Sequence, residues 1–309
     1  MRSNAAPMLC WETVVSEDLQ MTETKGPGVL YVVATPIGNL EDCTYRAVRT
    51  MRECDLIACE DTRQTQKLLD HYGIKKPAIS YHEHNEAQRA EELVAKLEQG
   101  LTIAQVSDAG MPGISDPGYR VVRLAVEHGI RVVPIPGPSA LITALAASGL
   151  PTDAFEFRSF LPAKSGQRRT MIESLRGIQH TVAFYEAPHR IRESLRDVAE
   201  LLGAATPVVV ARELTKIHEE FLRGSAAQVL AVAEQRELKG EITLLIGKTE
   251  AADSTSQKNL EERLNSLMRE RHLDEKAALK ALAKEQGCSK SELYRELQRI
   301  QASGHGKRK

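Results

Sequence analysis

Three clusters of ionisable side chains stand out in the sequence, each directly after a short apolar run. They are Glu60-Asp-Thr-Arg63, His82-Glu-His-Asn-Glu86 and the long Ser107–Gly118 segment. Glu60 and Asp61 are adjacent carboxylates at the end of an apolar run, where like charges raise the pKa of one of them. A carboxyl group or a histidine tuned in this way can act as a general base. The candidates for that role are Glu60, Asp61 and His84, with His82 beside them.

Each candidate also has a plainer interpretation. Asp61 is well placed to be the N-cap of a helix over Thr62–His71. Arg63 suits a phosphate contact or an ion pair with Glu60 or Asp61. His84 fits a base, a ligand contact or an ordinary surface histidine equally well, so the residues alone do not assign the base.

The apolar runs predict the elements that must position these clusters. Buried strands are expected at Val29–Ala34, Leu56–Cys59, Ala78–Tyr81, Thr102–Val106 and Arg131–Ile135. Between two of them, the spacing of Ala87, Ala90, Leu93, Val94 and Leu97 predicts a helix over Glu86–Glu98. Alternation of strands and helices predicts an α/β fold with a parallel sheet covered on both faces. Ligands of such sheets bind at the carboxyl ends of the strands, where these polar loops meet.

A proline-rich segment at Pro134–Pro138 divides the chain into two α/β halves. The second half has apolar runs at Val182–Tyr185, Val208–Ala211 and Ile242–Ile246, with weaker strands at Phe155–Phe157 and His218–Leu222, for which an antiparallel direction is considered. The expected organisation is an N-terminal extension (1–28), two α/β domains (29–138 and 139–250), a polar linker (251–257) and a helical module (257–301).

Three helical patterns are expected in that module. The faces are Leu260, Leu264, Leu267 and Met268, then Ala277–Lys284, then Leu293, Leu297 and Ile300. The turn Gln286-Gly-Cys288 and the capping box Ser289-Lys-Ser-Glu292 separate the last two, which is the outline of a helix-turn-helix.

Composition excludes several protein classes. The chain has 309 residues, with 42% hydrophobic and 27% charged residues, as expected for a folded two-domain protein. Its longest apolar runs are too short for a membrane-spanning helix, and residues 1–27 do not resemble a secretory signal. The five cysteines form no CxxC pair and no zinc-type cluster. We therefore expect a cytoplasmic protein without a structural metal.

The net charge of −1 conceals an asymmetry. Residues 257–309 hold 13 Lys and Arg against 8 Asp and Glu, a net of +5, and the remainder holds 28 against 34, a net of −6. A basic tail on an acidic body is a reason to consider a nucleic-acid partner.

The composition of these loops narrows the class of ligand that they can bind. The Rossmann GxGxxG and the Walker A motif are both absent, and the loops contain no lysine, which does not favour a phosphate cradle. A ligand with amino, carboxylate, hydroxyl and adenine groups suits backbone groups of a glycine-rich loop together with a few acids.

Seven strings carry a resemblance to a known family: TPIGNL, EDTR, HNE, SDAGMPGISDPG, PGPSA, YEAPHRI and GEITLLIG. In order, from about Leu30 to Lys248, they resemble the tetrapyrrole methylase superfamily. Within it they resemble the bacterial small-subunit rRNA (cytidine-2′-O)-methyltransferase I family. The end of the chain, Ser289–Tyr294, is similar to the helix-turn-helix extension of that branch.

The resemblance implies a fold, a cofactor and a reaction. It implies two α/β domains with S-adenosylmethionine in the cleft between them, a homodimer, and 2′-O-methylation of a cytidine of 16S rRNA in the decoding region of the 30S subunit. The implied cofactor contacts are Pro36, Asp108, Ala109, Gly110, Ser115, Asp116, Pro136, Gly137, Ser139, Ala140, Tyr185, Glu186, Glu213, Leu214, Gly240 and Thr243. Superfamily relatives carry Gly-Asp-Pro where this chain has Ser115-Asp116-Pro117, so only the acid and the proline match.

Basic residues supply the expected RNA contacts: Arg63, Arg168, Arg169, Lys290 and Arg295, together with Asn85. For any one of them, a solvated helix face is an equally good interpretation, and the C-terminal helices could instead cover the dimer. Two alternative functions are a methylase of a corrin-type small molecule and a non-catalytic RNA-binding ribosome-assembly factor.

Overall fold

The computed structural model describes residues 26–249, 263–269, 273–285, 289–291, 293–295 and 297–298. The chain forms two compact units. The first contains the residues up to Val33, Tyr45–Asp108 and Asp116–Ile135, and the second contains Ala34–Thr44, Ala109–Ser115 and the residues from Pro136 onward. Two short loop segments, 34–44 and 109–115, therefore group with the second unit. Most of the expected N-terminal extension and the whole of the expected linker lie outside the described residues.

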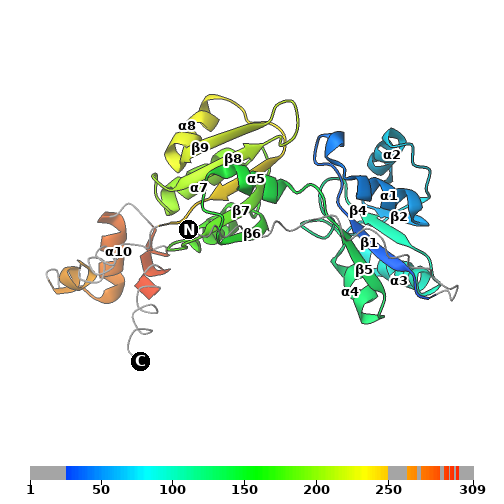
Figure 1. The fold of residues 1–309 in the computed structure, drawn as a ribbon. Helices are drawn as coiled ribbons and strands as arrows, with labels where there is room; N and C mark the ends of the chain where they lie inside the picture. Colours follow the sequence, from blue (N-terminus) through cyan, green and yellow to red (C-terminus); the bar gives the residue numbers. More distant parts are fainter. Residues whose placement is uncertain are drawn as a thin grey trace, which may run out of the picture. The chain divides into compact units, whose positions relative to one another are not determined.

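The first unit is built on a five-stranded parallel sheet in the order β3-β2-β4-β1-β5 (Figure 1). The predicted parallel sheet is confirmed, and each predicted strand is matched within one residue at either end. The elements of this unit are β1 (Val29–Val33), α1 (Tyr45–Glu53), β2 (Leu56–Cys59), α2 (Thr62–His71), β3 (Ala78–Ser80), α3 (Glu86–Glu98), β4 (Ile103–Val106), α4 (Tyr119–Glu127) and β5 (Arg131–Ile135).

Helices cover both faces of this sheet, which explains why β2, and β4 apart from Gln105, are apolar without alternation. All four residues of each of these strands are buried. Leu93 and Leu97 of α3 and Val121 of α4 pack with Leu30 and Ile103 in one core, while α1 and α2 lie on the opposite face (Figure 1). The predicted helix over Glu86–Glu98 is confirmed, since α3 has the same bounds.

The second unit has a mixed sheet in the order β6-β7-β10-β8-β9, in which only β6 and β7 are parallel. Its elements are η2 (Leu40–Asp42), α5 (Ala140–Ser148), β6 (Phe155–Phe160), α6 (Ser165–Glu173), β7 (Thr181–Glu186), α7 (Ile191–Leu201), β8 (Pro207–Arg212), β9 (Glu220–Ser225), α8 (Ala226–Gln235) and β10 (Ile242–Ile246). The two weaker predicted strands exist but are displaced. β6 runs to Phe160 through a register shift, and β9 begins two residues later than predicted.

Successive residues of the central strands of this sheet enter different cores. Val208 and Val210 of β8 pack against α6, α7 and α8, whereas Val209 and Ala211 pack with α5 and Ile37. Because both faces are covered, the strands are apolar throughout, as the sequence indicates.

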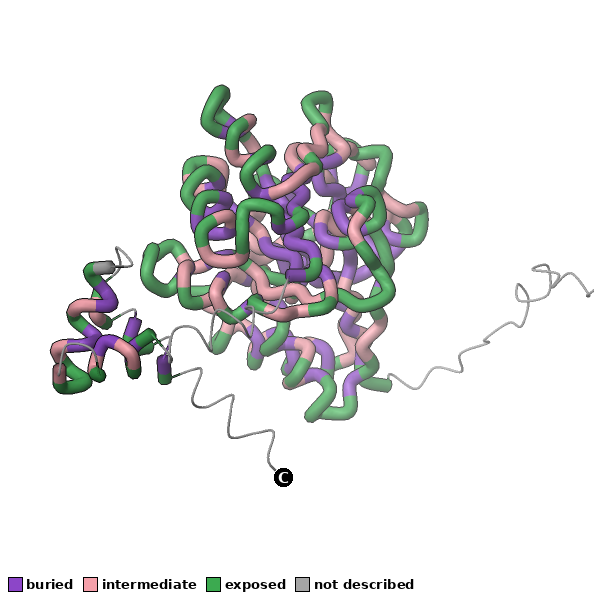
Figure 2. The backbone as a smooth tube through the Cα atoms, turned by 90° about the vertical axis from the view of Figure 1, so that its left-hand side faces the viewer, coloured by how far each residue is buried: buried purple, intermediate pink, exposed green. Residues whose placement is uncertain are grey.

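The C-terminal helices have a small core of their own. Leu264 and Leu267, then Leu279 and Leu282 of α10 (Glu275–Glu285), then Leu293, form one buried cluster. Figure 2 shows buried stretches, in purple, along the C-terminal helices. The predicted apolar faces are thereby confirmed for the described positions. Leu260, Ile300, the turn Gln286–Cys288 and Glu292 of the capping box lie outside the described residues or side chains.

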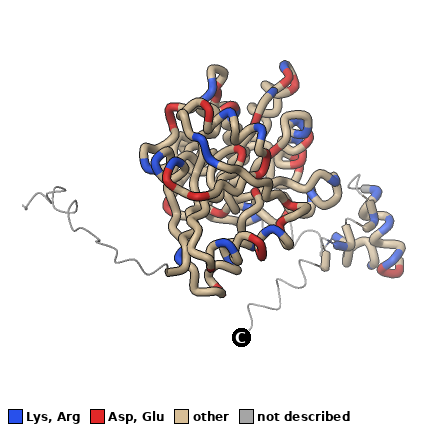
Figure 3. Tube along the Cα trace, turned by 90° about the vertical axis from the view of Figure 1, so that its right-hand side faces the viewer, with Lys and Arg blue, Asp and Glu red and all other residues tan. Residues whose placement is uncertain are grey.

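Charged residues of both signs are interspersed over both units (Figure 3). In the sequence, residues 263–298 hold eight Lys or Arg against six Asp or Glu. Within the described residues, no helix is both long and apolar enough to cross a membrane. No group of three His, Cys, Asp or Glu side chains in that part of the chain is arranged to hold a metal ion.

Candidate active site

Strands β2 and β4 are neighbours in the first sheet, and their carboxyl ends bring two acidic loops together. Glu60 and Asp61 follow β2, and Asp108 follows β4 after Ser107. The backbone N–H of Asp61 donates to Oδ1 of Asp108 at 3.2 Å. The parallel register thus places at one edge of the sheet two loops that are 47 residues apart in the chain.

The Asp61 carboxylate is hydrogen-bonded at the start of α2, where it is the N-cap. Its Oδ1 accepts from the N–H of Arg63 at 2.8 Å, and its Oδ2 pairs with the Arg63 guanidinium at 2.8 Å. These bonds lower the pKa of Asp61 to about 2. The N-cap interpretation and the Arg63 ion pair both hold, and such a carboxylate is a poor proton acceptor at neutral pH. The Arg63 side chain is 87% exposed, so its RNA contact stays a prediction.

The other carboxylates of this edge hold their protons more tightly than usual. Burial raises the pKa of Glu60, and the charge of Asp108 raises it further. Burial also raises the pKa of Asp108. Burial and then the charge of Glu60 raise the pKa of Asp116 to about 6, against a hydrogen bond from Ser107 that lowers it. Perturbed carboxylates gathered at a sheet edge are typical of functional sites.

The loop after β3 is organised by Asn85. Its Oδ1 accepts from the N–H of His82 at 2.9 Å, and its amide nitrogen lies 3.3 Å from both the Ser80 carbonyl and Nε2 of His82. Because that amide nitrogen is a donor, Nε2 of His82 must accept and the neutral ring carries its proton on Nδ1. The Asn85 amide is thus used within its own turn, and the expected RNA contact of this half-buried residue stays a prediction. His84 is exposed, with its ring edge-on to His82.

The segment 109–115 of the long loop belongs to the second unit. Gly110 pairs with Thr35 through two backbone hydrogen bonds of 2.9 and 3.0 Å, and its φ of 81° requires glycine. Gly137 approaches the loop after β1 closely, since a Cβ there would lie 2.8 Å from that of Ala34. The glycines of the predicted cofactor loops therefore have specific backbone reasons to be glycine.

Glu213 and Gly240 form another close contact in the second unit. Oε1 of Glu213 accepts from Nζ of Lys216 at 2.9 Å and from the N–H of Glu241 at 3.0 Å. Gly240 has a φ of 87°, and a Cβ there would lie 2.2 Å from Oε1 of Glu213. The Glu213 carboxylate therefore occupies the space of a missing side chain at Gly240.

The remaining residues predicted to contact the cofactor differ in their exposure to solvent. Pro36, Leu214 and Thr243 are buried, and Tyr185 is half-buried with its ring 5.0 and 5.5 Å from the rings of Phe157 and Phe160. Ala109, Pro136 and Gly137 are exposed, whereas Ser139, the N-cap of α5, and Ala140 are half-buried. Cofactor contact at these positions stays a prediction.

The side chain of Glu186 is buried and is used by the fold, so its predicted contact with the cofactor is corrected. Its side chain is 0% exposed and pairs with Arg190 at 2.7 Å. Its oxygens also accept from the N–H of Ala187 and the hydroxyl of Ser194. A buried carboxylate with these partners stabilises the turn between β7 and α7.

Arg168 and Arg169 form an ion-pair cluster between α6 and α7. Nε of Arg168 lies 2.7 Å from Asp197, and Arg169 pairs with Asp197 and Glu200 at 2.6 and 2.7 Å. The Arg168 side chain is 3% exposed and that of Asp197 is 8% exposed. Arg168 is buried and balances the Asp197 carboxylate, so its expected RNA contact is corrected; the sequence does not indicate this pair because Asp197 is 29 residues away. The Arg169 side chain is 36% exposed, and its RNA contact stays a prediction.

Two comparisons with known proteins bear on the family. The family model described as Tetrapyrrole (Corrin/Porphyrin) Methylases matches residues 29–230. The chain is 47% identical over 279 residues to the ribosomal RNA small subunit methyltransferase I of Synechocystis, covering 90% of this chain and all of that protein. It is 46% identical to the proteins of the same name from Halalkalibacterium halodurans (86% of this chain, 93% of that protein) and Escherichia coli O157:H7 (87% and 94%).

The chain belongs to the tetrapyrrole methylases, and within them to the ribosomal RNA small subunit methyltransferase I family. The resemblance read from the seven strings is thereby confirmed.

Solved structures agree on the fold of this methylase family. Diphthine synthase aligns with a TM-score of 0.56 at 13% identity, covering 72% of this chain and 91% of that one. A cobalt precorrin-4 methyltransferase aligns with a TM-score of 0.54 at 15% identity, covering 71% and 94%. The Thermus thermophilus uroporphyrin-III C-methyltransferase, complexed with S-adenosyl homocysteine, aligns at 0.50 with 17% identity, covering 71% and 97%. At these identities the likeness concerns the fold alone.

Two polar side chains beside the candidate site make contacts that the sequence did not predict. Glu86 ends the HNE string but was not assigned a role, and its carboxylate reaches the start of α4. Gln105 lies inside buried strand β4 and is 1% exposed, with its amide on the carbonyl of Pro117. A polar residue within a buried apolar run was the signal available for Gln105.

Proposed function

We propose that this chain transfers a methyl group from S-adenosylmethionine to the ribose 2′-oxygen of a cytidine in 16S rRNA. The observation that carries the proposal is the identity of 46–47% to ribosomal RNA small subunit methyltransferase I proteins over 86–90% of the chain. The finer proposal is that the substrate is the decoding region of the assembled 30S subunit, which places the reaction in the cytoplasm. We also propose a homodimer, on the support of the family resemblance.

The donor set on this chain fits S-adenosylmethionine. The ammonium and ribose hydroxyls of that molecule are hydrogen-bond donors, and the carboxylates of Asp108 and Asp116 are acceptors. When bound, the cofactor supplies the electrophilic methyl group. The task of the protein is then to align the ribose oxygen and to receive its proton.

Glu60 is the proton acceptor that the geometry favours. Its pKa is raised by burial, and its carboxylate makes no hydrogen bond with any other described residue. Asp61 is bound to Arg63, and His84 is exposed. A carboxylate with a raised pKa takes a proton from a hydroxyl more readily than an ordinary one.

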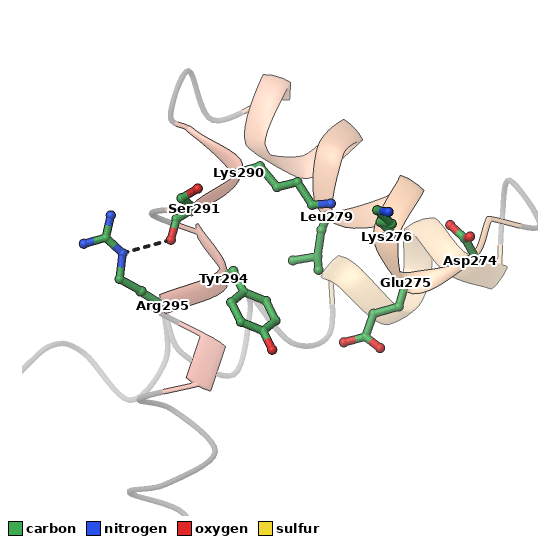
Figure 4. Close-up of a pocket in the computed structure, with 8 residues that line it drawn as sticks. All are labelled: Asp274, Glu275, Lys276, Leu279, Lys290, Ser291, Tyr294 and Arg295. Carbon is green, nitrogen blue, oxygen red and sulfur yellow. Dashed lines mark hydrogen bonds between the residues drawn. The ribbon is translucent and has the colours of Figure 1, made fainter.

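The C-terminal helices offer a surface for RNA. Lys276 and Leu279 of α10, with Lys290, Tyr294 and Arg295, line an open cavity of about 820 Å³ (Figure 4). The Tyr294 side chain is 46% exposed, which suits stacking of an unpaired base, and the cations suit backbone phosphates. Asp274 and Glu275 line the same cavity, so the basic character is local rather than uniform.

The experiment is methyl transfer from labelled S-adenosylmethionine to 30S subunits purified from a strain that lacks the gene. The proposal predicts label in 16S rRNA, and loss of label when Asp108→Ala and Asp116→Ala are combined. Removal of residues 257–309 should weaken this reaction, whereas a corrin-type methylase would keep its activity. Absence of label, or label that survives the double substitution, contradicts the proposal.

A further inference from the structure

Glu86 joins two loops of the first unit. It is the first residue of α3, yet its Oε1 accepts from the N–H of Gly118 at 3.1 Å, at the N-cap of α4. Its Oε2 lies 3.3 Å from Nε of Arg120. The Glu86 side chain is only 15% exposed, so these bonds are shielded from water. A carboxylate from one helix therefore caps the beginning of another.

Tyr81 completes this arrangement. Its hydroxyl donates to Oε1 of Glu86 at 3.0 Å and accepts from the N–H of Val121 at 3.3 Å. The residue is 2% exposed, and burial together with Glu86 raises the pKa of its hydroxyl. The end of β3 and the first turn of α4 are thereby held by a buried network.

Gln105 holds Pro117, the residue that precedes Gly118. Its side-chain amide, inside β4, donates to the carbonyl of Pro117 at 3.1 Å. Gly118 has a φ of 156° with a ψ of −32°, a conformation that only glycine adopts readily. Two consecutive residues, Pro117 and Gly118, are therefore fixed by polar side chains, one from strand β4 and one from the first residue of helix α3.

The restrained turn follows Asp116 directly. Asp116 is half-buried, and burial together with the charge of Glu60 raises the pKa of its carboxyl to about 6. Without the restraint, the carboxylate could turn toward water and escape that environment. Burying a polar side chain is costly, and more so for Gln105 because its buried Oε1 has no hydrogen-bond partner among the described residues, so an apolar residue in β4 would serve packing alone at least as well.

We propose that Glu86 and Gln105 are positioning residues that hold the Asp116–Gly118 turn so that the Asp116 carboxylate meets the donor groups of S-adenosylmethionine. This inference rests on the function proposed above. Neither residue touches the cofactor; both act through the turn. Their removal should therefore weaken cofactor binding more than it slows methyl transfer at saturating cofactor.

The test compares Glu86→Ala, Glu86→Gln, Gln105→Leu and Tyr81→Phe with the full-length wild-type chain. The control is Glu92→Ala, which removes an exposed ion pair with Arg89 on the same helix. Calorimetry gives the Kd for S-adenosylmethionine, transfer to 30S subunits gives kcat and KM, and thermal unfolding shows that each variant is folded. If Glu86→Ala does not fold, Gln105→Leu and Tyr81→Phe carry the test.

We expect Kd and KM to rise about tenfold in Glu86→Ala and Gln105→Leu, the effect of losing one buried hydrogen bond, with a smaller change in kcat. Glu86→Gln should restore most of the affinity, because its amide oxygen still accepts from Gly118. Glu92→Ala should bind like wild type. A merely structural role would lower the unfolding temperature and leave Kd and KM unchanged.

The variant Asp116→Ala distinguishes a failure of the positioning inference from a failure of the proposed function. Wild-type affinity in Glu86→Ala and Gln105→Leu, with affinity lost in Asp116→Ala, overturns the positioning inference and leaves the proposed function standing. Wild-type affinity in all three overturns the inference together with the assignment of Asp116. Absence of S-adenosylmethionine binding to the wild-type protein overturns the proposed function itself, and the inference with it.

Discussion

The hydroxyl of Ser115 lies 2.8 Å from the hydroxyl of Ser159, and both residues have left-handed backbone conformations, with φ of 64° and 55°. Ser115 ends the loop segment that groups with the second unit, and Ser159 lies within the register shift of β6. Two serines in an unfavourable backbone conformation, joined by a hydrogen bond, indicate that the surrounding structure holds the end of this loop in place.

Two substitutions of Ser159 distinguish the effect of its hydrogen bond to Ser115 from the effect of its left-handed backbone conformation. Ser159→Ala removes the hydroxyl and keeps the left-handed strain, whereas Ser159→Gly removes both. We expect the glycine variant to be more stable than the alanine variant by about 1 kcal/mol. Both should bind S-adenosylmethionine several-fold more weakly than wild type, since both release Ser115. Urea unfolding and calorimetry measure the two effects, and equal affinity in wild type and both variants would show that the bond does not matter for binding.

Gly240 is predicted to tolerate no side chain. Gly240→Ala places a Cβ where Oε1 of Glu213 lies, and the carboxylate cannot move without breaking its bonds to Lys216 and Glu241. The matched control is Gly149→Ala, at a φ of 80° with nothing within 4 Å of its Cβ. We expect a loss of about 1 kcal/mol for the control from conformation alone, and about 1–3 kcal/mol more at Gly240. Equal losses in denaturant unfolding would mean that Glu213 relaxes freely.

Asp116 should give opposite pH trends for stability and binding. Its pKa of about 6 lies above the 3.8 of an unperturbed aspartate, so between these values the folded chain binds a proton that the unfolded chain does not. Stability therefore falls as the pH rises from about 4 to about 6. Asp116→Asn should be more stable than wild type at pH 7, by at most about 3 kcal/mol, and show no such advantage at pH 4.

Cofactor binding should respond in the other direction. If the ionised Asp116 carboxylate accepts a hydrogen bond from the cofactor, wild-type affinity weakens as the pH falls through 6, and Asp116→Asn is weak throughout. Unfolding and calorimetry at several pH values test both trends. A wild-type affinity that is flat between pH 5 and 7.5 would separate Asp116 from binding.

Lys290 should carry part of the salt dependence of RNA binding. Each phosphate contact adds about 0.7–0.9 to the slope of log affinity against log salt concentration. Lys290→Gln should reduce the slope by about that amount. Lys284→Gln is the control, since Lys284 is an exposed lysine of α10 that does not line the cavity. An equal reduction in both variants would indicate general charge attraction instead of a contact in this cavity.

The sequence predicted most of the elements but fewer of the side-chain roles. Continuous apolar runs such as Leu56–Cys59 identify strands buried on both faces, and the order of strands and helices then determines a parallel sheet. The meeting of the loops at Glu60 and Asp108 follows from that topology. The direction of β6 was not predictable, because its pairing with β7 depends on contacts distant in sequence and on a register shift.

Side-chain partners explain the corrected residues. Arg168 and Glu186 each carry a charged group that suits a ligand, and each is used by the fold instead. Sequence spacing cannot show this, because the partners of Arg168 become neighbours only when α6 and α7 pack. Glu86 is the opposite case, a residue in a recognised string whose reach to Gly118 appears only in three dimensions.

The most direct test of the proposed reaction is a map of 2′-O-methyl groups in 16S rRNA from strains with and without the gene. The account predicts one cytidine in the 30S decoding region that is methylated in the parent strain and unmethylated in the deletion strain. Methylation should return with the wild-type gene and fail to return with the gene carrying both Asp108→Ala and Asp116→Ala. Identical maps from the two strains, or restoration by the doubly substituted gene, would contradict it.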